Sequence, residues 1–365
     1  MKISCEREKF SHAFQIAASV AATRDVKPVL QNVKIKVEKD NVLLQATDTE
    51  LGIRIYIDGC EVLEKGEAIL PTKRLRMILQ ESSDKTIQLE SSQDKTVVKG
   101  ERSRFTLATQ PPDEFPDVEE FAETAYHEIP SKVLREMIKR TTFATDTDNT
   151  RYALGGVFFE LLDEKAVAVA TDGRRLAAQD GIAKCVNDHQ VESAIFPSRA
   201  LQLVERALND DEESVKIAIS ANRGLFQYGR TVFFTRLVEG RFPGWKKIIP
   251  DPEGKTRVDI LAGALFSAVR QAAVVTSDKQ PGVNFSFEKG KMILQAHGVE
   301  IGDSSVETPI AYDGPKVEVK LDPKFMADFL RCLEAEKNIS LYIASEQPLS
   351  VRTDDGYIYV VMPLS

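Results

Sequence analysis

Residues 33–48 read VKIKVEKDNVLLQATD, and the same pattern returns without gaps at residues 157–172 (VFFELLDEKAVAVATD) and 283–298 (VNFSFEKGKMILQAHG). Each segment has a strand of alternating apolar residues, a polar turn and a second strand, which is typical of a β-hairpin. The copies lie roughly 125 residues apart, so the repeated unit has the size of a domain and not of a solenoid repeat.

A helical pattern precedes each hairpin, and a second one follows it. Apolar residues spaced near i, i+4 and i+7 predict the first helix of each copy, over 6–19, 131–143 and 262–275. A proline introduces each second helix, a position where a helix tolerates it, and these helices are predicted over 72–81, 198–208 and 322–333. Strand-like runs such as 215–219 follow, so each copy contains helix, strands, helix, strands.

Proline and acidic residues accumulate at two places, 111–123 and 249–254, and indicate domain boundaries. The predicted domains are therefore 1–125, 126–250 and 251–365, named here the first, second and third repeat. Each is expected to pack two helices on antiparallel β-sheet, which makes the chain α+β.

The composition predicts a cytoplasmic protein with no membrane segment. The N-terminus carries charge where a signal peptide needs an apolar stretch, and no later run approaches about 18 apolar residues. The four cysteines, Cys5, Cys60, Cys185 and Cys332, form no C-x-x-C pair. They are expected to be free thiols, buried as small hydrophobic side chains.

Charge is distributed unevenly along the chain, whose formal net charge is -8. The six predicted helices contain fourteen Lys and Arg but seven Asp and Glu, so the helices are basic and the remainder acidic. On any single helix this could be an ordinary solvated face. If the six helices line one surface, they would attract phosphates, weakly and without sequence preference, since no element suited to reading bases is evident.

Several strings resemble the bacterial sliding clamp family, the DNA polymerase III beta subunits. The similarity runs the length of the chain and is carried by residues 103–107 (SRFTL), 151–154 (RYAL), 170–177 (ATDGRRLA), 237–243 (LVEGRFP) and 359–364 (YVVMPL). The resemblance implies a ring of two three-domain chains joined head to tail, with helices lining the hole and sheets outside.

The resemblance also implies a pocket between the second and third repeats that binds peptides of partner proteins. The implied partners are the polymerase III alpha subunit, clamp-loader subunits and other proteins with a clamp-binding motif. A mostly apolar cleft suits a short extended peptide. The pocket residues would be Leu154, Thr171, Gly173, Arg174, Arg175, Leu176, Pro243, Lys247, Ile248, Ser350, Val360, Val361, Met362, Pro363 and Leu364.

Three positions depart from the best-known members of the family. Arg174 replaces His, Lys247 replaces Arg, and Ser365 stands in place of a basic tail, so peptide preference is expected to differ. The residues from Tyr357 to Val361 could equally form an ordinary core strand, and both interpretations can hold.

Further sites come from the same resemblance. The homodimer interface would join Phe105 and Leu107 to Val274 and Val275, although all four could be ordinary core residues. Contacts with double-stranded DNA would come from Arg24, Lys73, Arg135, Asn149, Arg151, Tyr152 and Arg199. An exposed loop without DNA contact is the alternative for Arg24.

Two other classes of function fit the sequence less well. Gly254-Lys255-Thr256 ends like a Walker A loop, but Ile249 occupies the position that must be glycine, and the four histidines show no metal-ligand spacing. No catalytic residue, cofactor or metal is therefore predicted. A scaffold that does not bind DNA would fit the repeats but leaves the basic helices unexplained.

Overall fold

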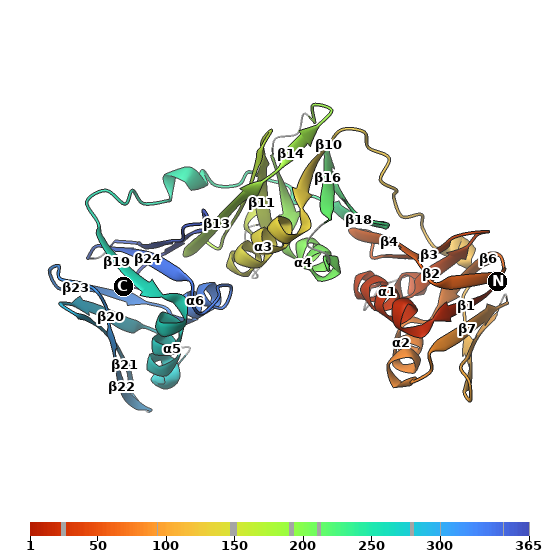
Figure 1. Ribbon diagram of the computed structural model, residues 1–365, viewed down its shortest axis with the longest axis horizontal. Helices are drawn as coiled ribbons and strands as arrows, with labels where there is room; N and C mark the ends of the chain where they lie inside the picture. Colours follow the sequence, from red (N-terminus) through yellow and green to blue (C-terminus); the bar gives the residue numbers. More distant parts are fainter. Residues whose placement is uncertain are drawn as a thin grey trace. The chain divides into compact units, whose positions relative to one another are not determined.

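The computed structural model describes residues 1–22, 27–92, 94–146, 152–189, 193–209, 213–277, 281–299, 301–345 and 347–364. Backbone contacts divide the chain into two compact units (Figure 1). Unit 1 contains Met1–Lys132, Ala183–Val191 and Arg199–Leu237, and unit 2 contains Val133–Ile182, Glu192–Ser198 and Val238–Ser365. The second repeat therefore contributes to both units.

Unit 1 contains two antiparallel sheets and the helices α1 (Arg7–Val20), α2 (Thr72–Glu81) and α4 (Ser198–Ala207). Its nine-stranded sheet runs in the order β14 (Lys184–Val186), β10 (Tyr126–Pro130), β16 (Ser214–Ser220), β17 (Arg223–Tyr228), β18 (Thr231–Arg236), β4 (Leu51–Ile57), β3 (Val42–Thr47), β2 (Val33–Val37) and β6 (Gly66–Leu70). Its five-stranded sheet has the order β5 (Cys60–Glu64), β1 (Lys2–Glu6), β7 (Thr86–Ser91), β8 (Lys95–Lys99) and β9 (Arg104–Ala108).

Unit 2 has the same kind of architecture, with helices α3 (Ser131–Thr141), α5 (Ala262–Ala272) and α6 (Pro323–Leu330). Its eight-stranded sheet runs β15 (Ser193–Pro197), β11 (Gly156–Leu161), β12 (Lys165–Thr171), β13 (Arg175–Ile182), β26 (Ile358–Val361), β25 (Leu349–Arg352), β24 (Asn338–Ile343) and β19 (Thr256–Leu261). The four-stranded sheet runs β22 (Gly302–Pro309), β21 (Lys291–Gly298), β20 (Val283–Glu288) and β23 (Val317–Leu321).

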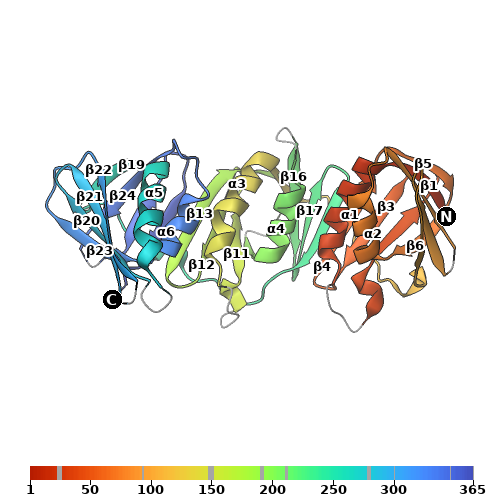
Figure 2. The same ribbon diagram turned by 90° about the horizontal axis from the view of Figure 1, so that it is seen from below.

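The helices cover the sheets with their apolar faces. In unit 1, α1 lies beside α2, and in unit 2, α5 lies beside α6 (Figure 2). Phe10 and Phe14 of α1 are fully buried, as their helical spacing predicts. All six predicted helices are confirmed, to within a few residues at each end. No helix among the described residues is long and apolar enough to span a membrane.

The three hairpins form with the same register, which confirms the repeat. Lys34 pairs with Gln45 in the first, Phe158 with Val169 in the second and Asn284 with Gln295 in the third. Because side chains alternate along a strand, equal register gives equivalent residues the same face in every copy.

Two sheets continue from one repeat into the next. In unit 1, β18 of the second repeat pairs with β4 of the first, and in unit 2, β26 of the third repeat pairs with β13 of the second. Phe233 lies opposite Ile53 in the first junction, and Tyr359 lies opposite Ala177 in the second. The last strand of one repeat thus completes the sheet of its predecessor.

Cys5 and Cys60 form a disulfide, so the expectation of four free thiols is wrong for this pair. The sequence did not reveal the pairing because β5 was not predicted, and only the β1–β5 ladder places these cysteines opposite each other. Cys185 and Cys332 are free. Burial raises the pKa of the Cys332 thiol to about 11.

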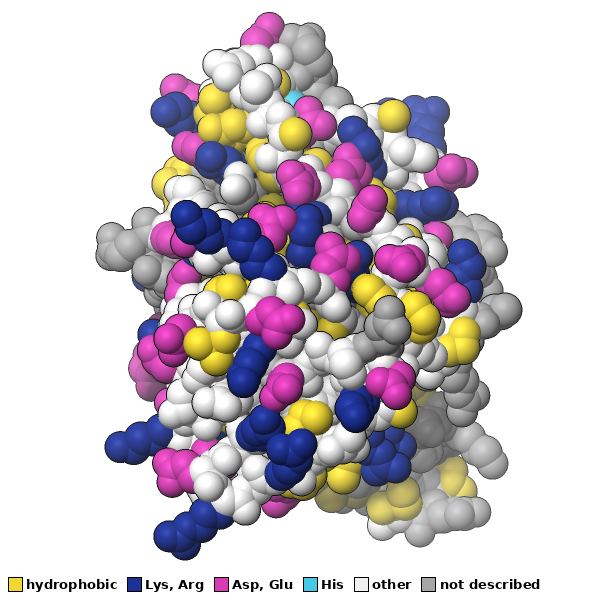
Figure 3. All heavy atoms as spheres, turned by 90° about the vertical axis from the view of Figure 1, so that its right-hand side faces the viewer, with side chains coloured by type: hydrophobic (Ala, Val, Ile, Leu, Met, Phe, Trp, Pro, Cys, Tyr) yellow, Lys and Arg dark blue, Asp and Glu magenta, His cyan; other side chains and the backbone are white. Residues whose placement is uncertain are grey.

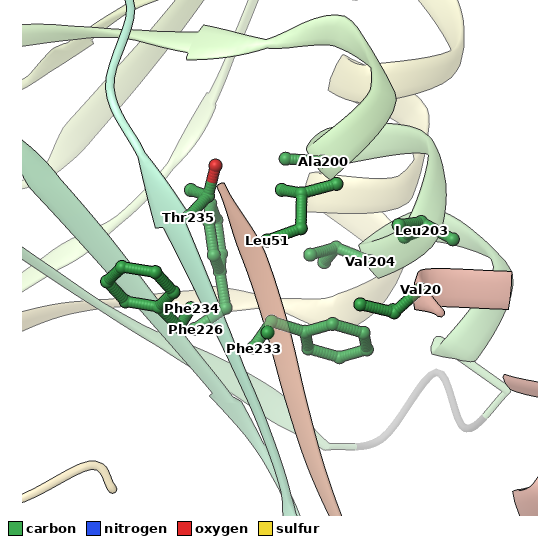
Figure 4. A pocket seen from close by; sticks show the side chains of 10 residues that line it. Val20, Leu51, Ala200, Leu203, Val204, Phe226, Phe233, Phe234 and Thr235 are labelled. Atoms are coloured by element: carbon green, nitrogen blue, oxygen red, sulfur yellow. The ribbon is translucent and has the colours of Figure 1, made fainter. Parts of the chain in front are cut away.

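A small cavity of about 10 Å³ lies in unit 1, between α4, the end of α1 and strands β4, β17 and β18 (Figure 4). Its walls are almost entirely apolar and include Val20, Leu51, Leu203 and Phe233. A space of this size and polarity is too small for a ligand and offers a water molecule few partners. The cavity is therefore a packing defect and not a candidate site.

Candidate functional site at the β13–β26 junction

The outer face of the β13–β26 junction, opposite the helices, is apolar. Leu176 and Val360 lie directly opposite each other in the ladder and belong to one buried cluster with Leu154. Phe242 and Trp245, from the segment that follows β18, pack against the same cluster. The structure thus brings together the predicted pocket residues Leu154, Leu176 and Val360 with Phe242 and Trp245, which the sequence analysis does not predict.

The edge of this cluster is exposed and mixed in character. Ile248 is 41% exposed and Met362 is 44% exposed, although both side chains are large and apolar. Arg174 and Lys247 are exposed, whereas Pro243, Pro363 and Leu364 are half-buried. Exposed apolar side chains beside a buried apolar floor are typical of a surface that binds another molecule.

A tight turn between β12 and β13 holds Arg174 at this edge. The Asp172 carboxylate accepts hydrogen bonds from the backbone N–H groups of Arg174 and Arg175, at 2.9 and 3.0 Å. The Thr171 hydroxyl donates to the carbonyl of Arg175 at 2.6 Å, and Gly173 adopts a positive φ of 87°. Beyond the end of β26, the Met362 N–H donates to the carbonyl of Arg174 at 2.8 Å, which ties the C-terminal segment to the turn.

The side chains of Arg175 and Val361 lie on the opposite face, toward the helices, although both were predicted to line the pocket. Alternation along paired strands requires this, because Leu176 and Val360 point outward. Arg175 is 8% exposed and bonds Asp172 at 2.9 Å and Asp328 of α6 at 2.8 Å. Burial opposes the charge of Arg175, but the hydrogen bond that its guanidinium donates to Asp328 and the neighbouring negative charges outweigh burial and raise the pKa of Arg175. Arg175 therefore fastens α6 to the junction.

Ser350 lies in the floor of the junction. It pairs with Val360 in the β25–β26 ladder and is fully buried. Its hydroxyl has no hydrogen-bond partner among the described residues, which is uncommon for a buried polar atom.

Of the predicted dimer residues, Phe105 and Leu107 lie on an edge strand, whereas Val274 and Val275 lie on a short helix beside the edge strand β22. Strand β9, which holds Phe105 and Leu107, is the last strand of the five-stranded sheet, and Phe105 is 40% exposed. Val274 and Val275 belong to the 3₁₀ helix η6 (Ala273–Val275), and Val274 is 74% exposed. Such exposure of large apolar side chains near an open strand edge is unfavourable in a monomer.

Only some of the predicted DNA-contacting residues can be placed. Lys73 on α2 and Arg199 on α4 are exposed, and Arg199 forms an ion pair with Asp48. Arg135 on α3 is half-buried. Arg24, Asn149, Arg151 and the side chain of Tyr152 lie outside the described residues.

The observed helices keep the positive excess, with thirteen Lys and Arg and five Asp and Glu. By contrast, the end of unit 1 that carries the N-terminus shows basic and acidic side chains mixed across its surface (Figure 3).

The sequence suggests that the four histidines are scattered, but two of them lie together in the structure. His127 and His189 lie in contact, with their Nδ1 atoms 3.1 Å apart, because strand β10 and the segment after β14 are neighbours. His189 also bonds the backbone of Ile219, which is a structural role. Among the described residues, no group of three or more potential metal ligands occurs.

Comparison with known proteins assigns the chain to a family. The model of the DNA polymerase III beta subunit N-terminal domain matches residues 1–119, that of the central domain matches residues 128–244, and that of the C-terminal domain matches residues 246–365. The chain belongs to the DNA polymerase III beta subunit family. The resemblance seen in the sequence is therefore confirmed, and the protein is a sliding clamp by descent and fold.

Relatives within this clamp family match along their whole length. The beta sliding clamp of Pseudomonas putida is 30% identical over 370 residues, and that of Escherichia coli K12 is 26% identical over 372 residues, each covering all of both chains. The crystal structure of the beta subunit from Pseudomonas aeruginosa superposes with a TM-score of 0.90 at 28% identity, again over all of both chains. Another clamp structure from that organism, with a TM-score of 0.91, is bound to griselimycin.

Proposed function

We propose that two copies of this protein close into a ring around duplex DNA, and that the outer face of the β13–β26 junction tethers replication proteins to it. The observation that carries the proposal is the pairing of sheets across successive repeats. The ring itself has no catalytic role in this proposal and needs no cofactor.

The two sheet junctions within the chain follow one pairing rule. The last strand of a repeat pairs with the strand that follows the hairpin of the preceding repeat. Strands β9, β18 and β26 are equivalent last strands of their repeats, and β4, β13 and β22 each follow the hairpin of their repeat. Strand β18 pairs with β4 and β26 pairs with β13, while β9 and β22 are edges of their sheets among the described residues. The same rule therefore pairs β9 of one copy with β22 of another. Two such contacts close a dimer, because head-to-tail contacts form rings when the rotation closes.

The equivalence also predicts the register. Phe105 corresponds to Phe233 and Tyr359, since each faces the equivalent residue of the preceding strand: Val98, Phe226 and Val351. Ser304 corresponds to Ile53 and Ala177, so Phe105 should lie opposite Ser304 of the second copy. Arg104 then lies opposite Ser305, with Asp303 and Glu307 of the second copy on the two diagonals. This charge match favours the head-to-tail arrangement.

Charge supports the proposed contact with DNA. The helices carry the positive excess, whereas the chain as a whole is acidic. Helices that face phosphates would attract duplex DNA without reading its sequence, and the acidic remainder would repel it from the outside. Direct binding to DNA is expected to be weak and to fall with salt.

Charge reversal across the predicted register tests the dimer. Arg104→Glu should raise the dimer dissociation constant about 10- to 100-fold, because it places like charges on both diagonals. Adding Asp303→Lys and Glu307→Lys should restore the dimer, as measured by sedimentation equilibrium. Arg102→Glu, outside β9, is the matched control. A folded wild-type monomer at micromolar concentration, or absence of rescue, would reject the pairing.

Topology tests encirclement separately. Protein assembled on a closed circular DNA by a clamp loader should remain bound in high salt and leave when the circle is cut. Equal retention on linear and circular DNA would show binding without encirclement.

Peptide binding tests the junction. Ile248→Asp should weaken binding of a peptide from a polymerase III alpha subunit about tenfold or more, because it places a charge on the apolar edge. Ile182→Asp changes an isoleucine that is 65% exposed elsewhere in unit 2 and is the control. Calorimetry measures the affinity of the peptide for each folded variant. Equal affinities would mean that the peptide binds elsewhere.

A further inference from the structure

The four-stranded sheet of unit 2 has a hollow of about 810 Å³ on the face that points away from the helices. A row of side chains crosses its floor in register, because Lys320 pairs with Asn284, Asn284 with Gln295, and Gln295 with Ser305. The His297 ring and the Asp303 carboxylate form a hydrogen bond beside this row, and Leu364 closes one side. The lining is mixed, with polar side chains across the floor and Pro281, Ala296 and Leu364 around them, and it includes the cation of Lys320.

The equivalent faces of the other repeats are covered by the chain itself. Asn284 and Gln295 correspond to Phe158 and Val169 of the second repeat. There, Phe242 of the segment after β18 stacks on Phe158 at 5.0 Å, and Val169 is fully buried. In the first repeat, Phe115 and Val118 of the segment after β9 pack on Leu30 and Ile69 in the same way. Each of these faces therefore holds an extended segment of polypeptide.

The third repeat begins the same path. After β18, the Val238 N–H donates to the carbonyl of Ile195 on β15, and after β26 the Leu364 N–H donates to the carbonyl of Lys320 on β23. Strands β15 and β23 are equivalent, because each pairs with the first strand of its hairpin. Among the described residues, none lies across the face beyond Leu364, and Asn284 and Gln295 are exposed.

The chemistry of the lining indicates the occupant. Side-chain amides and a hydroxyl can bond an extended backbone in both directions, and an exposed ammonium favours a carboxylate. The segment Met362–Leu364 runs from the β13–β26 junction, where the Met362 N–H bonds the Arg174 carbonyl, to the hollow, which Leu364 lines. In the proposed dimer, Arg104 of the second copy would add a further cation beside Ser305.

We propose that this hollow binds an extended, carboxylate-bearing segment that flanks the apolar anchor of a partner protein seated at the β13–β26 junction. The inference rests on the proposed peptide-binding function and extends it. The partner segment takes the path that the chain's own segments take on the first two repeats.

The test uses one synthetic anchor peptide that contains leucine and phenylalanine. It is measured alone and with a four-residue extension at either end. The extension contains two aspartates or, as the neutral control, two asparagines. On the full-length protein, the aspartate extension at one end should raise affinity about tenfold over the anchor alone, and Lys320→Glu should remove that gain. Affinity for the anchor alone should change less than about twofold. Calorimetry measures all pairs.

Lys289→Glu makes the same charge change in the β20–β21 turn of this sheet and is the matched control. An extension that adds no affinity at either end, or equal effects of Lys320→Glu and Lys289→Glu, would overturn the proposal. Failure of the anchor peptide itself to bind would instead reject the site at the β13–β26 junction. The two failures are therefore distinguishable.

Discussion

Leu51 and Arg175 occupy the same position in two repeats, three residues after the aspartates that close the hairpin turns. Leu51 borders the small apolar cavity of unit 1. Arg175 instead reaches Asp172, Asp328 and the carbonyl of Phe143, and its guanidinium lies 4.4 Å from the ring centre of Phe325. One substitution between repeats thus replaces loose apolar packing with a network of ion pairs.

Arg175→Ala should lower the free energy of unfolding by about 3–5 kcal/mol, because it leaves the largely buried carboxylate of Asp172 without its cation and leaves Asp328 with only the exposed Arg331. Chemical denaturation monitored by circular dichroism gives the value. Arg174→Ala removes the neighbouring but exposed arginine and should change stability by less than about 0.5 kcal/mol. Equal losses in the two variants would contradict a role for the network.

Asp355 links two repeats inside unit 2. Burial alone would raise the pKa of its carboxyl, but hydrogen bonds from Thr353, from Arg140 of α3 and from Lys337 outweigh burial and hold the pKa well below its usual value. A carboxyl whose pKa is lowered by folding stabilises the fold above its unfolded-state pKa, and this contribution is lost as the pH falls through the folded-state pKa.

Asp355→Asn should therefore lower the free energy of unfolding at pH 7 by about 1–2 kcal/mol, a value reduced for the partial exposure of this carboxylate. The difference from the wild type should shrink as the pH falls below about 4. Urea denaturation at several pH values between 7 and 3 measures it. A difference that stays constant over this range would show that the charge of Asp355 contributes nothing.

At the scale of the elements, the β18–β4 junction depends on a close approach. Phe234 lies opposite Gly52, and Val118 of the segment after β9 covers the same spot. A Cβ at position 52 would lie 2.8 Å from the Val118 side chain, closer than packed atoms allow. The equivalent residue at the second junction is Leu176, which forms the floor of the candidate site. The first junction is thereby closed by its own chain, and the second keeps exposed apolar edges.

Gly52→Ala should lower the free energy of unfolding by about 1–3 kcal/mol, because Val118 must move away. Gly244→Ala is the matched control, since no atom lies within 4 Å of its added Cβ and its φ of -70° suits alanine. Thermal unfolding followed by calorimetry compares them. The interpretation fails if the Gly52 variant is as stable as the Gly244 variant.

The helices and hairpins could be predicted because their periodicity is local. Strand partners could not, since the β18–β4 and β26–β13 ladders join residues more than 120 positions apart and no local pattern specifies them. The same limit explains the site. Sequence similarity identified Leu154, Leu176 and Val360, which pack together, but the side to which Arg175 and Val361 point depends on strand pairing. Cys5 and Cys60 also required the β1–β5 ladder.

At the scale of the whole molecule, the compact units do not coincide with the predicted domains. The second repeat is shared between both units, because its strands β10, β14, β16, β17 and β18 extend the sheet of the first repeat and its strands β11, β12, β13 and β15 extend that of the third. The domain boundaries at 125 and 250 remain predictions from sequence. The strongest connections between repeats are backbone ladders, and the linkers run beside them.

The β18–β4 ladder has a consequence for how the chain could be divided. Backbone pairing and the packing of Phe121 against the buried cluster of Ala218, Leu225 and Val232 hold the first repeat to the second without requiring a peptide bond between them. The covalent connection mainly keeps the two parts at a high effective concentration. Residues 1–125 and 126–365, produced as separate polypeptides in one cell, should therefore assemble and elute together on size exclusion.

Phe234→Glu in the longer fragment is expected to abolish this complementation, because it places a charge on a half-buried side chain that packs against Gly52 across the ladder. Fragments that each fold but elute apart without that substitution would show that the intact linker, and not strand pairing, holds the first two repeats together.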